Sequence, residues 1–190
     1  MKKYSLLLLP ILAMLALGCK KDKTETDNPI QIGKFYAGGY IFHIYSDGQH
    51  GMVLAPPSVE RDIPWGCSNT VLGLTSPQYA VFGSGAGNTY FISQICQDGN
   101  SAAKFCADLA VNGFDDWFLP SIDELDSALA KLRENPAADL KIDLFYWSST
   151  EGPNGGVYSY SNSSLPAQRR KVNTNKATSP GVLLRPVRIF

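Results

Sequence analysis

The sequence predicts one α+β domain made of small antiparallel sheets, two principal helices and long loops. Three observations carry this prediction. Glycine, proline, serine and asparagine recur throughout the chain, aromatic residues make up 11% of it, and only two stretches have a helical period. Residues 31–190 have an ordinary size for one domain, large enough to bury a core, and no internal repeat divides them.

A β-hairpin is predicted at the start of this domain. β-type runs at 34–45 and 52–55 flank a turn that contains Asp47 and Gly48, a residue pair typical of hairpin turns. A long irregular stretch follows from 56 to 88. We therefore expect an antiparallel pair of strands followed by a long loop.

The middle of the chain is expected to hold the first helices. The glycine-rich segment 83–89 predicts a tight turn, because no Lys-Ser/Thr pair follows it to make a phosphate-binding loop. A short helix is expected over 90–95. The first amphipathic helix is expected over 101–111, with Asn100 as its cap.

The second amphipathic helix is expected to begin at Ser121, which has the spacing of a capping box with Glu124, and to end at Asn135 before a proline. Strands are predicted at 146–150 and 182–190. Three large apolar side chains near these elements are expected in the hydrophobic core: Trp117, Leu119 and Trp147.

Residues 1–18 are predicted to be a lipoprotein signal peptide. Lys2 and Lys3 precede an apolar run at 6–17, which ends shortly before Cys19. This pattern resembles bacterial lipoprotein signals, in which Cys19 would carry a diacylglycerol and become the first residue of the mature chain. A plain secretory signal is the alternative. A transmembrane helix is disfavoured, because the run of about a dozen residues is shorter than the ~20 that span a bilayer.

Residues 19–30 are charged and have no apolar period, so we expect a flexible tether between the lipid and the domain. Loss of residues 1–18 removes Lys2 and Lys3 from the 17 basic side chains, which leaves 15 against 17 acidic ones. A mature net charge near −2 gives no support to nucleic-acid binding. The expected location is the bacterial cell envelope, with the lipid anchor in the outer membrane.

Four segments of the domain together resemble one known family: 83–89, 112–125, 146–149 and 184–188. The family is the Lcl C-terminal domain family (DUF1566), common in bacterial lipoproteins and surface proteins. Its members carry an Asn-Gly-Tyr-x-Asp-Trp-x-Leu-Pro-Ser/Thr-x-x-Glu-Leu block. This chain differs from the block by Phe114 in place of Tyr and has Asp115 at the free position. The resemblance covers nearly all of residues 31–190.

The resemblance implies a C-type-lectin-like fold, in which the first and last strands pair and two helices flank small twisted sheets. It also implies adhesion rather than catalysis. The related formylglycine-generating enzymes use a pair of thiols near their C-terminal end, whereas this chain has no cysteine beyond Cys106. We therefore expect a protein without enzymatic activity and without a cofactor.

Three cysteines remain in the domain, and export to an oxidising compartment permits one disulfide with one thiol left over. Cys106 lies in the middle of the apolar stripe of a predicted helix, where a buried thiol fits. The favoured pairing is therefore Cys67 with Cys96, both near loop or helix ends, although the other pairings of the three stay open.

Metal binding and nucleophilic catalysis have weak support in the sequence. The spacings typical of zinc sites are absent, and the two histidines, His43 and His50, lie in and beside the first hairpin. Asp115 and Asp116 are adjacent carboxylates and Glu151 is another, but the alternating carboxylates typical of calcium loops do not occur. We predict no metal site, and calcium binding stays an open question.

The segment 151–181 is the predicted ligand-binding region, because it is rich in Gly, Ser, Asn and Tyr, a composition typical of paratopes. The residues predicted to bind the ligand are Tyr158, Tyr160, Arg169, Arg170 and Lys171. The three cations would meet sulfate or carboxylate groups. Alternatively, they form a solvated strand edge that prevents strand-to-strand aggregation.

These observations predict a surface-anchored, non-catalytic recognition module for a glycan, a polyanion or a surface protein. The alternative function is a structural or assembly lipoprotein that docks a neighbouring envelope protein. An enzyme of the formylglycine-generating type is the least favoured of the three.

Overall fold

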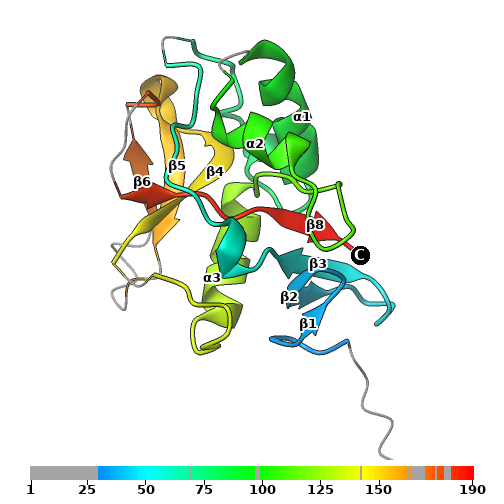
Figure 1. The fold of residues 1–190 in the computed structure, drawn as a ribbon. Coiled ribbons are helices and arrows are strands. Elements are labelled where there is room, and N and C mark those ends of the chain that lie inside the picture. The colour runs from blue at the N-terminus through cyan, green and yellow to red at the C-terminus, as the bar shows by residue number, and fades with distance from the viewer. Residues whose placement is uncertain are drawn as a thin grey trace, which may run out of the picture.

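The computed structural model describes residues 30–68, 70–96, 99–141, 143–161, 163, 170–173, 175–177 and 181–190. The described part of the chain is a mixed α+β structure with three α-helices and two four-stranded sheets (Figure 1), which confirms the predicted α+β class. Its hydrophobic core consists of four clusters of buried side chains, all drawn from the described residues between 30 and 190.

The first sheet contains the predicted hairpin. β2 (Gly39–Ile44) and β3 (Gly51–Leu54) pair antiparallel, and Asp47 Oδ1 accepts hydrogen bonds from two backbone N–H groups in the turn between them. β1 (Phe35–Tyr36) lies beside β2 and β8 (Val187–Ile189) lies beside β3, which gives the order β1-β2-β3-β8. The last strand therefore joins the same sheet as the first strand, at the opposite edge.

The second sheet has the strand order β6-β5-β4-β7. Its members are β4 (Phe145–Glu151), β5 (Val157–Ser161), β6 (Arg170–Asn173) and β7 (Val182–Leu183). β4 runs antiparallel to β5 and parallel to β7. The single terminal strand predicted over 182–190 is wrong, because this segment divides into β7 and β8, which belong to different sheets.

The helices of the described chain are α1 (Gly85–Ile95), α2 (Ala102–Asp108) and α3 (Ile122–Leu132), and short 3-10 helices lie at Pro57–Val59, Pro77–Tyr79 and Pro153–Gly155. Ser101 is the N-cap of α2, and its Oγ accepts from the backbone N–H of Lys104 at 3.3 Å. The predicted cap at Asn100 is therefore one residue too early.

The buried side chain of Glu124 joins the start of α3 to the start of α1. It completes the predicted capping box with Ser121, whose N–H donates to the carboxylate at 2.7 Å. The same carboxylate accepts from the N–H groups of Gly83 at 2.7 Å and Gly85 at 3.4 Å. A Cβ at Gly85 would lie 2.2 Å from the carboxylate, so only glycine fits there. The turn predicted over 83–89 is wrong, since α1 begins at Gly85.

Three of the segments on which the expected family resemblance depends, 83–89, 112–125 and 146–149, contact one another in the interior. Thr89 Oγ1 lies 2.9 Å from the backbone nitrogen and 3.1 Å from the backbone oxygen of Leu119. Asn88 Nδ2 donates to Ser149 Oγ at 3.1 Å. The three residues predicted to lie in the core are buried, which confirms that prediction: Trp117, Leu119 and Trp147. These segments therefore serve mainly to build the fold.

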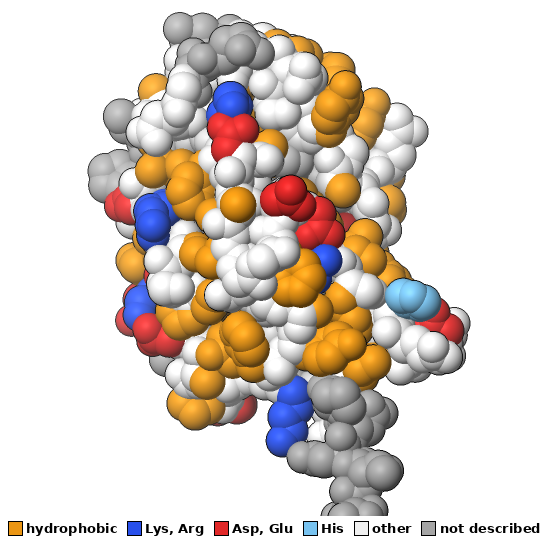
Figure 2. Space-filling model, turned by 45° about the vertical axis from the view of Figure 1, so that its right-hand side comes forward, with side chains coloured by type: hydrophobic (Ala, Val, Ile, Leu, Met, Phe, Trp, Pro, Cys, Tyr) orange, Lys and Arg blue, Asp and Glu red, His pale blue; other side chains and the backbone are white. Residues whose placement is uncertain are grey.

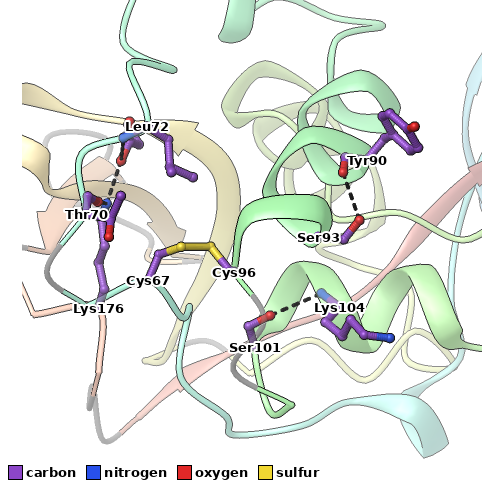
Figure 3. The surroundings of a disulfide bond; sticks show 10 residues. Cys67, Thr70, Leu72, Tyr90, Ser93, Cys96, Ser101, Lys104 and Lys176 are labelled. Carbon is purple, nitrogen blue, oxygen red and sulfur yellow. Dashed lines mark hydrogen bonds and ion pairs between the residues drawn. A yellow bond between two sulfur atoms is a disulfide. The ribbon is translucent and has the colours of Figure 1, made fainter.

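The structure contains the predicted disulfide between Cys67 and Cys96, whose Cα atoms lie 5.2 Å apart (Figure 3). The bond ties the irregular stretch after β3 to the C-terminal end of α1. Cys106 is free and fully buried on α2, as predicted.

Replacing Glu124 with Ala is expected to destabilise the segment 30–190 by about 2 to 3 kcal/mol, because three backbone N–H groups lose their acceptor inside the protein. Urea unfolding measures this change. Asp123→Ala is the matched control, since the Asp123 side chain is half-exposed, forms only a surface ion pair with Arg170, and should cost less than about 1 kcal/mol when removed. Equal effects of the two substitutions would contradict the role given to Glu124.

Reduction of the Cys67–Cys96 bond is expected to lower the free energy of unfolding of the same segment by about 3 to 4 kcal/mol, because the bond closes a loop with a sequence separation of 29. Urea unfolding with and without reductant measures the loss. A Cys67→Ala/Cys96→Ala variant should not respond to reductant, and Cys106→Ala should respond as the parent does. A reductant effect that disappears in Cys106→Ala would indicate another pairing.

Candidate ligand-binding cleft

A cleft of about 590 Å³ lies between α1, α2 and the segment 116–118 that leads into α3. It has the size of a small-molecule site. Its lining residues come from all three segments: Ala86, Thr89, Tyr90, Ser93, Gln94, Lys104, Ala107, Asp108, Asp116, Trp117 and Phe118. Figure 2 shows the face formed by this part of the molecule, with acidic side chains near its middle and hydrophobic side chains above and below them.

Tyr90 is the most exposed large apolar side chain on α1. The helix buries Thr89 and Ile92 against the core, and this orientation turns the Tyr90 ring outward. The ring is 70% exposed and projects from α1 on the side away from the disulfide (Figure 3). An exposed tyrosine at the rim of a cleft offers a flat apolar face and a hydroxyl for contact with a ligand.

The α2 wall contributes an ion pair between Lys104 and Asp108, one helical turn apart. Both side chains remain accessible, at 35% and 61% exposure. The ammonium therefore keeps donors for a ligand, and the carboxylate keeps acceptor capacity. An exposed pair of this kind contributes little to stability.

Asp116 contributes a second carboxylate that is held in one orientation. Arg188 donates to it through Nε at 2.5 Å and Nη2 at 2.9 Å, and the guanidinium also stacks on the Phe114 ring at 3.9 Å. These hydrogen bonds lower the pKa of Asp116 below its ordinary value, so the carboxylate stays ionised. The Asp116 side chain is 51% exposed and presents its remaining lone pairs to the cleft.

Groups that can form hydrogen bonds line much of the cleft. Hydroxyl, amide, ammonium and carboxylate groups surround a tyrosine ring, over a floor of Trp117 and Phe118. Neither histidine lines the cleft, and Cys106 lies buried in an apolar environment that raises the pKa of its thiol. The described residues contain no group of three or more His, Cys, Asp or Glu side chains placed to hold a metal ion.

The structure separates the residues that were predicted to bind the ligand. Tyr160 is 8% exposed and packs into the core against α3, so its ring is not available to a ligand in this arrangement. Tyr158 is half-buried beneath the guanidinium of Arg170, at 5.5 Å, and Arg170 also forms an ion pair with Asp123 at 3.2 Å. Arg169 and Cys19 lie outside the described residues.

Arg170 and Lys171 point to opposite faces of the second sheet. Successive side chains of a strand alternate between faces, and here Arg170 contacts Tyr158 whereas Lys171 lies over the Phe145 ring at 5.5 Å. Both residues lie on β6, which is an edge strand. The two described cations therefore do not form one patch, and their position fits the alternative of a charged strand edge.

Two of the three carboxylates considered for calcium, Asp116 and Glu151, have protein partners. Asp116 binds Arg188, whereas Glu151 is fully buried and accepts hydrogen bonds from Lys176 and from the backbone of the irregular stretch.

Sequence reasoning missed the cleft because it assigned 83–89 to a turn. The available signal was Tyr90 and Phe91, two adjacent aromatic residues after glycines, because neighbouring side chains on a helix point in different directions.

Comparison of the chain with protein-family models and with curated proteins gives no match. In the described part of the chain, no helix has both the length and the apolar character needed to cross a bilayer.

Asp116→Asn is expected to lower the free energy of unfolding at neutral pH by about 1 to 2 kcal/mol, because Arg188 loses a charged partner. The loss is no larger because Asp116 is half-exposed and water screens the ion pair. Since the pKa of Asp116 is lowered in the fold, its contribution is present above the unfolded value of about 4 and is lost as the pH falls through the folded value. Unfolding measured between pH 2 and 7 should show this acid loss in the parent and not in the variant. Asp115→Asn is the control and should keep the parent's profile.

Proposed function

We propose that this chain is a non-catalytic recognition module that binds a neutral glycan in the cleft between α1 and α2. The observation that carries the proposal is the combination of an exposed tyrosine with hydroxyl, amide, ammonium and carboxylate groups around one hollow of about 590 Å³. The apolar C–H face of a sugar ring packs on an aromatic ring, while its hydroxyls donate to carboxylates and accept from ammonium and amide groups.

The charges of the cleft favour a neutral ligand over a polyanion. Lys104 is paired with Asp108, and Arg188 with Asp116, so each cation near the cleft already faces a carboxylate. A polyanion would have to displace these partners or be repelled by them. A neutral sugar avoids this repulsion and uses the carboxylates as acceptors.

A binding role fits this site better than a catalytic one. Arg188 keeps Asp116 ionised, which opposes a role as a general acid near neutral pH. Glu124, whose pKa burial raises, is committed to three backbone N–H groups in the interior. These observations support recognition, and an assay for hydrolysis of bound glycans would test it directly.

The proposed setting is the bacterial envelope, with a lipid on Cys19 and the tether 19–30 holding the domain near the outer membrane. The α+β architecture, with the last strand in the sheet of the first, supports a C-type-lectin-like fold. Nucleic acid is not a proposed partner. The face proposed here is the α1/α2 cleft in place of the 151–181 region, because Tyr160 is buried and Arg170 is already paired.

A glycan array probed with the segment 30–190, with and without calcium, tests the proposal. The parent should bind one class of neutral glycan, and Tyr90→Ala should weaken that binding by about tenfold, the loss of roughly one ring contact. Lys171→Ala is the control on β6 and should bind as the parent does. If Lys171→Ala lost glycan binding while Tyr90→Ala kept it, the binding site would lie in the 151–181 region and the proposed cleft would be wrong.

A further inference from the structure

A second hollow of about 400 Å³ lies on the other side of α1 from the cleft. Positions 84, 87, 88 and 91 of the α1 region face it, whereas positions 86, 89, 90 and 93 face the cleft. Its lining residues contain no charged side chain: Leu72, Leu74, Gln78, Tyr79, Gly83, Ser84, Gly87, Asn88 and Phe91. The hollow is therefore suited to an uncharged, largely apolar ligand.

Buried polar contacts fix the loop wall of this hollow. The Glu151 carboxylate accepts from the N–H groups of Leu72 and Leu74, each at 3.0 Å. Lys176 balances this carboxylate at 2.5 Å and also donates to Thr70 O at 2.7 Å. Figure 3 shows the Lys176 side chain reaching from its own segment to Thr70. The wall is thus held in place before any ligand binds.

Hydrogen bonds also fix the opposite wall of the hollow. The backbone oxygen of Tyr79 lies within hydrogen-bond distance of three side-chain donors: Ser84 Oγ at 3.0 Å, Asn88 Nδ2 at 2.7 Å and Thr150 Oγ1 at 2.8 Å. Glu124 holds Gly83 on the same side. Because both walls are anchored to the interior, small shifts of the lining residues do not close the hollow. Binding therefore costs little free energy for ordering the lining.

Asn88 supplies the observation that points to a ligand. Its side chain lines the hollow and is only 3% exposed. The Nδ2 group must face the Tyr79 oxygen, because a carbonyl accepts only from the amide nitrogen, and this fixes the position of Oδ1. No residue in the described ranges donates to Oδ1. A buried acceptor without a donor is unfavourable, and a ligand N–H or O–H would satisfy it.

We propose that this hollow receives an aromatic side chain that carries one hydrogen-bond donor, the indole of a tryptophan or the phenol of a tyrosine, from a protein partner. The ring packs against Leu72, Leu74 and Phe91, and its N–H or O–H donates to Asn88 Oδ1. Phe91 is 41% exposed, and two further exposed apolar residues adjoin the lining segments, Val71 at 65% and Val81 at 46%. This surface extends beyond one ring, which favours a protein over a free small molecule.

Indole and 1-methylindole are the matched probes for the segment 30–190, which contains all four core clusters. They share shape and apolar character, but only indole has an N–H. Two-dimensional NMR of the Asn88 side-chain amide should show saturable binding of indole, and 1-methylindole should bind about tenfold more weakly for want of one hydrogen bond. Equal binding of the two probes, or binding of neither, would overturn the proposal.

Gly87→Leu tests whether indole binds in this hollow. Gly87 lines the hollow and a Cβ there meets no atom within 4 Å, so a leucine has space to extend toward the ligand, and it favours the helix more than glycine does. Indole binding should be lost while the melting temperature is kept or raised. Ala86→Leu is the control: it fills the glycan cleft and should leave indole binding intact. Retention of indole binding in Gly87→Leu would overturn the proposal.

N-acetyltryptophanamide separates a protein partner from a free small molecule. Its peptide groups extend from the ring toward the surface beside Val71 and Val81, so it should bind at least as tightly as indole. Weaker binding than that of indole would exclude a protein partner. The glycan array does not depend on any of these results, because the two hollows lie on different sides of α1.

Discussion

The buried carboxylate of Glu124 is the contact on which the described structure most depends. It caps α3 at Ser121 and binds the N–H groups of Gly83 and Gly85, so that α1 begins where the glycines alone would favour a turn. Burial raises the pKa of Glu124, and its hydrogen bonds act in the opposite direction. Both hollows use α1 as a wall, so the shape of each depends on this one acid.

Two buried ion pairs also connect distant segments. Arg185 donates to Glu60 at 3.1 Å and to two backbone oxygens, and Lys176 binds Glu151 while its ammonium lies 4.6 Å from the Trp65 ring centre. Loss of one partner would leave an uncompensated charge in the interior. In the described part of the chain, these buried polar residues therefore mainly hold loops to sheets.

Sequence reasoning located the framework better than the site. The capping box at Ser121, the hairpin at Asp47 and the burial of Trp147 follow from spacing and side-chain type, and the structure has all three. The predicted site at Tyr158, Tyr160 and the cations 169–171 depended mainly on composition. Composition does not say which face of a strand packs on a helix, and here the face that carries Tyr160 packs on α3.

The sequence by itself determined the α+β class, the hairpin and the capping box of α3, because each depends on local periodicity or turn chemistry. It favoured the Cys67–Cys96 pairing without excluding the other two, and the structure decided between them. The tertiary structure alone decided where α1 begins, how the terminal segment divides between two sheets, and which side chains line the two hollows. Those outcomes depend on contacts between residues far apart in the chain, such as Glu124 with Gly85, 39 positions away. A pattern of neighbouring residues contains no information about contacts between distant segments, so only the folded structure shows which residues meet.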